Sequence, residues 1–201
     1  MKDNAQKNYE TALPDGYREV LRINAKDVKT AILFTLASLV PLALVLVIAF
    51  LAGRSAGLQM NIYQSAHVSP DLLIWLAAII AYLIFHELLH GAAYKKLTGQ
   101  KLTFGISWSC AFCGVPNIYV YRKAVLIAVI LPFAVFTALF IPLTIVMFFV
   151  NGIAFFYTAI LLGLHLGGCV GDLYVFYLLL FRYKSNTVLV RDTGPEQFIY
   201  M

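Results

Sequence analysis

Charged side chains are scarce in this sequence. Lys, Arg, Asp and Glu make up 12% of the 201 residues, while hydrophobic residues make up 61%. Soluble globular domains carry about 25% charged and about 45–50% apolar residues. A large core does not explain so wide a difference, so the composition excludes an ordinary soluble domain and predicts a chain that lies in lipid. At this length a single domain, residues 1–201, is expected.

Cysteines are also few, and a short N-terminal apolar segment is lacking. The three cysteines (Cys110, Cys113 and Cys169) do not make a disulfide framework, and the lone C-x-x-C of Cys110 and Cys113 predicts two reduced thiols. The first apolar run, Ala31–Ala52, follows a polar, mixed-charge tail of 29 residues and is longer than the roughly 7–15 apolar residues of a signal peptide. We therefore expect it to be retained as a membrane span.

The net charge of +5 is not gathered on one face of a folded domain. The charges lie in tails and loops between apolar runs, which is not the pattern of a nucleic-acid-binding surface. No nucleic-acid partner is therefore expected.

Long apolar runs are what the sequence has instead. A hydrocarbon core of about 30 Å is crossed by about 20 apolar residues in a helix. Four stretches satisfy this, namely 29–52, 71–94, 123–150 and 153–181. Only Asn151 and Gly152 separate the last two, which predicts a tight turn between antiparallel helices.

Lys and Arg are distributed unevenly between the two sides that four spans would define. Fourteen lie in the N-terminal tail, the Lys95–Lys123 connection and the C-terminal tail, and only Arg54 lies on the other side. Because cytoplasmic loops carry the excess of Lys and Arg, this predicts a multi-pass integral membrane protein with both termini in the cytoplasm.

The connection between the second and third spans, residues 95–122, has β-strand character. Lys101–Trp108 and Asn117–Tyr121 are rich in β-branched and aromatic residues, and Gly114 and Pro116 lie between them. This predicts a cytoplasmic β-hairpin at the membrane surface. Tyr17–Ile23 and Thr187–Val190 are further candidates for short strands. The expected fold class is an all-α polytopic membrane protein with four transmembrane helices and a small β-hairpin between the second and third.

Ionisable residues inside a bilayer are costly, and each is a functional candidate. Apart from charges at the ends, the four spans contain only a few of them, and no Lys or Arg compensates the two acids. With cysteine and tyrosine set aside, these ionisable residues are His86, Glu87, His90, His165 and Asp172. A divalent cation is the simplest compensating charge.

His86-Glu87-Leu88-Leu89-His90 has the H-E-x-x-H pattern. Residues four apart share one face of a helix, so both imidazoles can reach one zinc ion, and Glu87 can act as the general base that deprotonates the attacking water. By chance this pattern occurs roughly once in 600 sequences of such composition. The alternative is a helix with incidental polar residues that its neighbours satisfy.

A catalytic zinc site takes a third protein ligand. Asp172 is the only acid inside the fourth span, and like His86 it lies about 14–15 Å from the Lys- or Arg-bearing end of its helix. Gly163, Gly167 and Gly171 form a small-residue stripe that would bring this span close to the second. His165 and Cys169 are the alternative third ligands, and a site with none also stays open.

These residues resemble those of site-2-protease-like intramembrane zinc proteases, and more closely those of small bacterial membrane proteins described as "putative zincin peptidases". The resemblance covers most of the chain. It rests on Leu13–Tyr17, His86–Gly91, Phe104-Gly105, Leu131–Phe133 and Gly171–Leu173. Site-2 proteases carry Asp-Gly where this chain has Gly171-Asp172, and no Asn-Pro precedes that pair.

The resemblance implies hydrolysis of peptide bonds in a membrane-associated protein or peptide substrate, within the bacterial cell membrane. It implies zinc as cofactor, His86, His90 and Asp172 as metal ligands, and Glu87 as the catalytic base. In site-2 proteases a similar hairpin is expected to present the substrate strand. The alternative function is a non-enzymatic membrane protein that binds or transports a metal.

Overall fold

The computed structural model describes residues 8–58, 70–108 and 110–201. Within these ranges, four helical stretches are long and apolar enough to cross a membrane. The first three are α1 (Val28–Ser55), α2 (Pro70–Thr98) and α3 (Arg122–Val150). The fourth consists of α4 (Gly152–Gly168), α5 (Val170–Tyr177) and the π-helix η2 (Leu178–Arg182). The break at Cys169, between α4 and α5, was not predicted.

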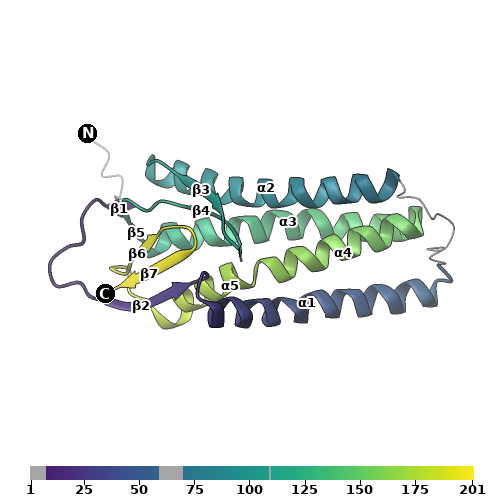
Figure 1. The fold of residues 1–201 in the computed structure, drawn as a ribbon, viewed down its shortest axis with the longest axis horizontal. Helices are drawn as coiled ribbons and strands as arrows, with labels where there is room; N and C mark the ends of the chain where they lie inside the picture. Colours follow the sequence, from purple (N-terminus) through teal and green to yellow (C-terminus); the bar gives the residue numbers. More distant parts are fainter. Residues whose placement is uncertain (1–7, 59–69, 109) are drawn as a thin grey trace. The chain divides into compact units, whose positions relative to one another are not determined.

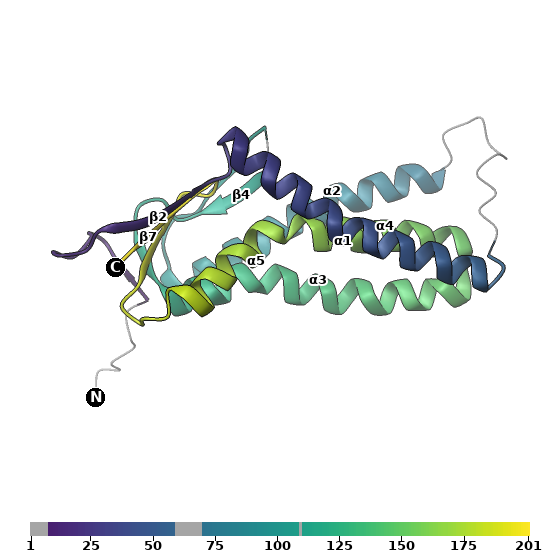
Figure 2. The same cartoon turned by 90° about the horizontal axis from the view of Figure 1, so that it is seen from below.

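The expectation of an all-α fold is wrong, because seven strands form two antiparallel sheets in the described part of the chain (Figure 1). The larger sheet has five strands in the order β1-β5-β6-β7-β2. Their bounds are Tyr9–Glu10 (β1), Glu19–Asn24 (β2), Tyr119–Tyr121 (β5), Leu189–Asp192 (β6) and Glu196–Tyr200 (β7). The N-terminal segment, the α2–α3 connection and the C-terminal segment thus meet in one sheet. Figure 2 shows β2 and β7, from opposite ends of the chain, side by side.

The hairpin between α2 and α3 exists, but its second strand is not the predicted one. β3 (Thr103–Ile106) pairs with β4 (Ala111–Gly114), with Phe104 opposite Cys113. The predicted partner, 117–121, forms β5 instead and pairs with β1 and β6. The connection therefore supplies both a small separate sheet and the second strand of the large one.

Local sequence signals explain where the helices begin and end. The Asp27 carboxylate accepts hydrogen bonds from the Thr30 backbone N–H (3.0 Å) and hydroxyl (3.1 Å), which caps the start of α1. Gly99 has φ +69° directly after α2 and donates its N–H to Lys95 O (2.9 Å), which ends that helix. Asn151 accepts from the N–H groups of Ile153 and Ala154 at 2.9 and 3.0 Å, so the predicted tight turn is also the cap of α4.

The chain divides into two compact units, and each boundary falls within a helix. The first, called here the sheet unit, combines Met1–Leu33, His86–Pro132 and Asp172–Met201. Its core lies against the five-stranded sheet, where Val120, Val190 and Ile199 are fully buried and lie in register on neighbouring strands. The ends of the helices that continue from this sheet belong to the same unit.

The second unit, called here the helix unit, combines Phe34–Phe85 and Phe133–Gly171. Its close helix contact is between α4 and α1. A Cβ added to Gly167 would lie 2.6 Å from Ser38 O, and one added to Gly163 would lie 2.8 Å from Leu42 Cδ1. The expectation that this glycine stripe faces the second span is therefore wrong, because it faces α1.

Many large apolar side chains on the helices are exposed in the chain alone. On α1 the exposed fractions include 68% for Val40 and 63% for Leu33, and on α2 the value for Ile74 is 68%. Soluble monomers rarely expose contiguous apolar surface on this scale. The exposure is therefore typical of helix faces that contact lipid.

Candidate metal centre

His86 and His90 lie one turn apart on the same face of α2. Both are buried, and their ring centroids are 5.0 Å apart. This follows directly from their spacing, since residues i and i+4 of a helix are neighbours. One helix face therefore presents two imidazoles to a common point.

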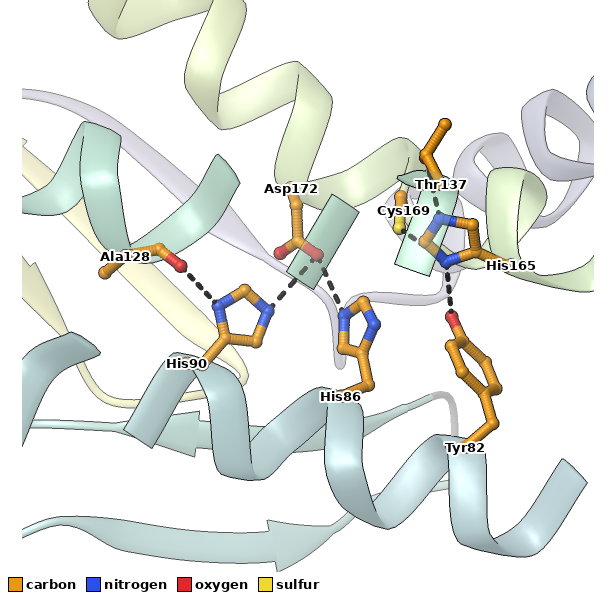
Figure 3. Close-up of polar contacts among 8 residues, drawn as sticks. All are labelled: Tyr82, His86, His90, Ala128, Thr137, His165, Cys169 and Asp172. Atoms are coloured by element: carbon orange, nitrogen blue, oxygen red, sulfur yellow. Dashed lines mark hydrogen bonds and ion pairs between the residues drawn. The ribbon is translucent and has the colours of Figure 1, made fainter. Parts of the chain in front are cut away.

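Asp172 completes the cluster from the first turn of α5. Its Oδ2 lies 3.2 Å from His86 Nε2 and 3.3 Å from His90 Nε2 (Figure 3). The break at Cys169 places Asp172 near a helix N-terminus, where the backbone N–H groups favour a negative charge. All three residues belong to the sheet unit.

The spacing of these atoms suits a zinc ion. Their ligating atoms all lie within 4.8 Å of one another. Two ligands of a tetrahedral zinc ion, each about 2.0–2.1 Å from the metal, are roughly 3.3 Å apart. Two imidazoles and one carboxylate are also a known set of ligands for catalytic zinc.

The hydrogen bond from His90 to α3 determines which ring nitrogen of His90 carries the hydrogen. His90 Nδ1 lies 2.9 Å from the carbonyl oxygen of Ala128, and a carbonyl only accepts, so Nδ1 carries a hydrogen. In a neutral ring, Nε2 is then a lone pair that faces the Asp172 carboxylate. Two acceptors at 3.3 Å repel each other unless a proton or metal ion lies with them. The hydrogen bond to the Ala128 carbonyl thus orients His90 as a metal ligand would be oriented.

Glu87 lies beside this cluster and is half-buried. Its carboxylate interacts electrostatically with His90, His86 and Asp172. Gly91, one turn further along the same side of α2, is covered by the β3 strand, because an added Cβ there would lie 2.7 Å from Phe104 Cζ. The β3–β4 hairpin therefore packs on the Glu87 side of α2.

The structure thus brings the four predicted site residues close to one another. His86, His90 and Asp172 form one cluster with Glu87 next to it, while their roles as ligands and base stay predictions. The backbone carbonyl of Ala128 was missed, and no side-chain pattern could have identified it.

His165, the alternative third ligand, lies in the helix unit and is fully buried there. Its Nε2 is 3.0 Å from Thr137 Oγ1, and its Nδ1 is 3.1 Å from the Tyr82 hydroxyl and 3.6 Å from Cys169 Sγ (Figure 3). The rings of Phe133, Phe136 and Phe140 surround it. Within its own unit, His165 therefore joins three helices through a polar network in an aromatic core.

Comparison with known proteins adds a family to this geometry. The model of the DUF3267 family, described as "Putative zincin peptidase", matches residues 79–188. This range covers just over half of the chain and contains the cluster of His86, Glu87, His90 and Asp172. No curated protein and no solved structure matches the chain. Zincins are peptidases that use zinc, so the family implies both a metallopeptidase and this metal. The chain belongs to this family of "putative zincin peptidases".

Proposed function

We propose that this protein is an integral membrane zinc metallopeptidase that hydrolyses peptide bonds of a membrane-associated protein or peptide. The observation that carries the proposal is the cluster of His86 Nε2, His90 Nε2 and Asp172 Oδ2, with Glu87 beside it. A purely structural zinc site has four protein ligands and no use for a neighbouring general base. Three ligands with a base are the arrangement of a hydrolytic site.

His86, His90 and Asp172 hold zinc in this proposal, and the Ala128 carbonyl fixes the ring of His90. When bound, zinc makes water a stronger acid and polarises the scissile carbonyl. Glu87 removes a proton from the attacking water as its oxygen bonds to the carbonyl carbon. Glu87 then delivers that proton to the nitrogen of the leaving amine as the C–N bond breaks.

The location in a membrane is supported by the four apolar helices and by their exposed apolar faces. All three proposed ligands lie within two of these helical stretches. A substrate able to reach them is one that is itself in or at the membrane.

The hairpin suggests how a substrate is held. Within the described residues, β3 pairs with β4 alone, and its Phe104 packs against α2 at Gly91, one turn from Glu87. An extended peptide can add to such a strand edge through backbone hydrogen bonds. We propose that β3 holds the substrate as a strand on the Glu87 side of the metal cluster.

The first test is zinc content, followed by cleavage. We expect one zinc per chain in detergent-purified wild type, loss of zinc in His86→Ala and retention in Glu87→Gln. Wild type should then cleave members of a proteome-derived peptide library in detergent micelles, detected by mass spectrometry as new amino termini. Glu87→Gln, which keeps the metal, should not.

Two outcomes contradict the proposal in different ways. Zinc binding without cleavage above the Glu87→Gln background favours the alternative, a non-enzymatic membrane protein that binds or transports a metal. Wild type that takes up no zinc after incubation with the metal contradicts both.

A further inference from the structure

The metal face of α2 continues for one more turn beyond the histidines. Tyr94 follows His90 at the same spacing of four residues, so His86, His90 and Tyr94 share one face. Tyr94 is only 1% exposed, and its hydroxyl donates a hydrogen bond of 2.6 Å to Asp192 Oδ2. Asp192 is the last residue of β6, is 2% exposed, and lies beyond residues 79–188 of the family match. None of the steps described so far uses this pair.

Further hydrogen bonds fix the position of Asp192. Its Oδ1 accepts the N–H of Gly194 at 2.8 Å, and its backbone carbonyl accepts the N–H of Val115 at 2.8 Å. The β6–β7 turn also lies directly against the end of β4, since a Cβ added to Gly114 would be 2.4 Å from Gly194 N. The acceptor of the Tyr94 hydroxyl is therefore fixed by two strands and a turn.

The bond acts on the helix at a point close to the cluster. Tyr94 is four residues from His90, about 6 Å along the helix axis. A rotation or slide of α2 that moved the His90 nitrogen away from Asp172 would also break the Tyr94 bond. A second hydrogen bond joins the C-terminal turn of α2 to the residue before β1, because the Asn8 amide donates to Leu97 O at 2.9 Å.

We propose that Tyr94 and Asp192 are positioning residues, which lock the metal face of α2 to the five-stranded sheet and hold His86 and His90 in register with Asp172. The inference rests on the proposed zinc site and goes beyond it, because it makes the C-terminal strands part of the metal centre's support. Partners that orient ligands typically contribute 10–100-fold to metal affinity. An ordinary structural hydrogen bond contributes to stability alone.

The test is zinc affinity, measured by competition with a chelator on the full-length protein in detergent. We expect Tyr94→Phe and Asp192→Ala each to weaken zinc binding by about 10-fold or more, with the double variant no weaker than the single ones. Asp192→Asn keeps an oxygen acceptor for Tyr94 and should stay within about 3-fold of wild type. The absorption bands of bound Co²⁺ should shift in Tyr94→Phe, because the ligand geometry changes.

Tyr17→Phe is the matched control. It removes a tyrosine hydroxyl in the same unit, one that donates to Thr187 O at 2.9 Å, in the segment between η2 and β6. Its zinc affinity and Co²⁺ spectrum should match those of the wild type.

The outcomes separate this inference from the proposed function. Zinc affinities and spectra of Tyr94→Phe that match those of Tyr17→Phe overturn the positioning role while leaving the zinc site intact. Equal losses in Asp192→Ala and Asp192→Asn also overturn it. Wild type without zinc overturns the proposed function, and the positioning role with it. If Asp192→Ala fails to fold, Tyr94→Phe, which removes one oxygen, decides the question.

Discussion

At the scale of single residues, the choice between Asp172 and His165 is the sharpest question. Asp172 faces both histidines of α2, while both ring nitrogens of His165 face polar groups of the helix unit. We therefore expect Asp172→Ala to lower zinc content to less than about one tenth of wild type. His165→Gln should keep the zinc and lose about 1–3 kcal/mol of stability, because a buried network is left partly unsatisfied.

Elemental analysis and thermal unfolding of the two purified variants test this pair. The reverse pattern, with zinc lost in His165→Gln and kept in Asp172→Ala, would show that His165 is the third ligand.

Asp192 makes the stability of the protein depend on pH. Burial is the main cause that raises the pKa of its carboxyl group from an ordinary 3.8 to about 6, against the lowering effect of the Tyr94 hydroxyl and the Gly194 N–H. The folded state therefore keeps this proton between pH 3.8 and about 6, where the unfolded state has lost it. Stability contributed by Asp192 is fully present below pH 3.8 and is lost as pH rises to about 6.

Asp192→Asn removes this titration and keeps an acceptor for Tyr94. Relative to this variant, the free energy of unfolding of wild type should fall by roughly 3 kcal/mol over the whole titration, of which roughly 2 kcal/mol falls between pH 4.5 and pH 7.5. Parallel denaturant titrations between pH 4.5 and 7.5 measure the difference. A difference that does not change with pH would contradict the raised pKa.

At the scale of helices and strands, the sequence predicted the helices better than the sheet. Helices of apolar residues are local features, so the runs of α1 to α4 were visible without any knowledge of their partners. The metal ligands on α2 were visible for the same reason, because the i, i+4 spacing of His86 and His90 is local. Asp172 needed an argument from depth, since its contact with α2 joins residues 86 positions apart.

The five-stranded sheet was missed because its pairing is not local. Arg22 of β2 lies opposite Phe198 of β7, and Val120 of β5 lies opposite Val190 of β6. Strands of two to six residues carry too little periodicity to reveal such partners. The signals at Tyr17–Ile23 and Thr187–Val190 were present, but nothing in the sequence indicated that 117–121 would join them rather than close the hairpin with β3.

The glycine stripe of α4 gives a prediction with a control in the adjacent residue. An added Cβ at Gly167 would lie 2.6 Å from the backbone oxygen of Ser38 on α1, so Gly167→Ala must push the two helices apart. At Gly168 the contact is 3.7 Å from the Tyr82 hydroxyl, an ordinary van der Waals distance. We expect Gly167→Ala to lose about 1–3 kcal/mol and Gly168→Ala to be neutral or stabilising by up to about 1 kcal/mol.

Thermal unfolding in detergent compares the two variants. Equal melting temperatures would mean that α1 and α4 do not approach each other at Gly167.

At the scale of the whole molecule, the sheet constrains how the chain crosses a membrane. Strands from the N-terminal segment (β1 and β2), from the α2–α3 connection (β5) and from the C-terminal segment (β6 and β7) pair with one another. All three segments must therefore lie on the same side of a membrane that the chain crosses. This requires an even number of crossings between each segment and the next. Two helical stretches separate each segment from the next, as four spans require. The excess of Lys and Arg in the same segments makes that side the cytoplasm in our proposal.

Labelling of single cysteines tests this arrangement. Ser55 at the end of α1 and Ser185 before β6 are both exposed and should lie on opposite sides of the membrane. Cys110→Ser is a suitable background, because Cys113 and Cys169 are buried and burial raises the pKa of the Cys113 thiol to about 12, which keeps it unreactive. In intact cells that express the protein, a membrane-impermeant maleimide should label Ser55→Cys and not Ser185→Cys, while both should be labelled after detergent lysis. Labelling of Ser185→Cys alone would reverse the orientation and leave the four crossings. Labelling of both in intact cells would put Ser55 and Ser185 on the same side and contradict three crossings between them.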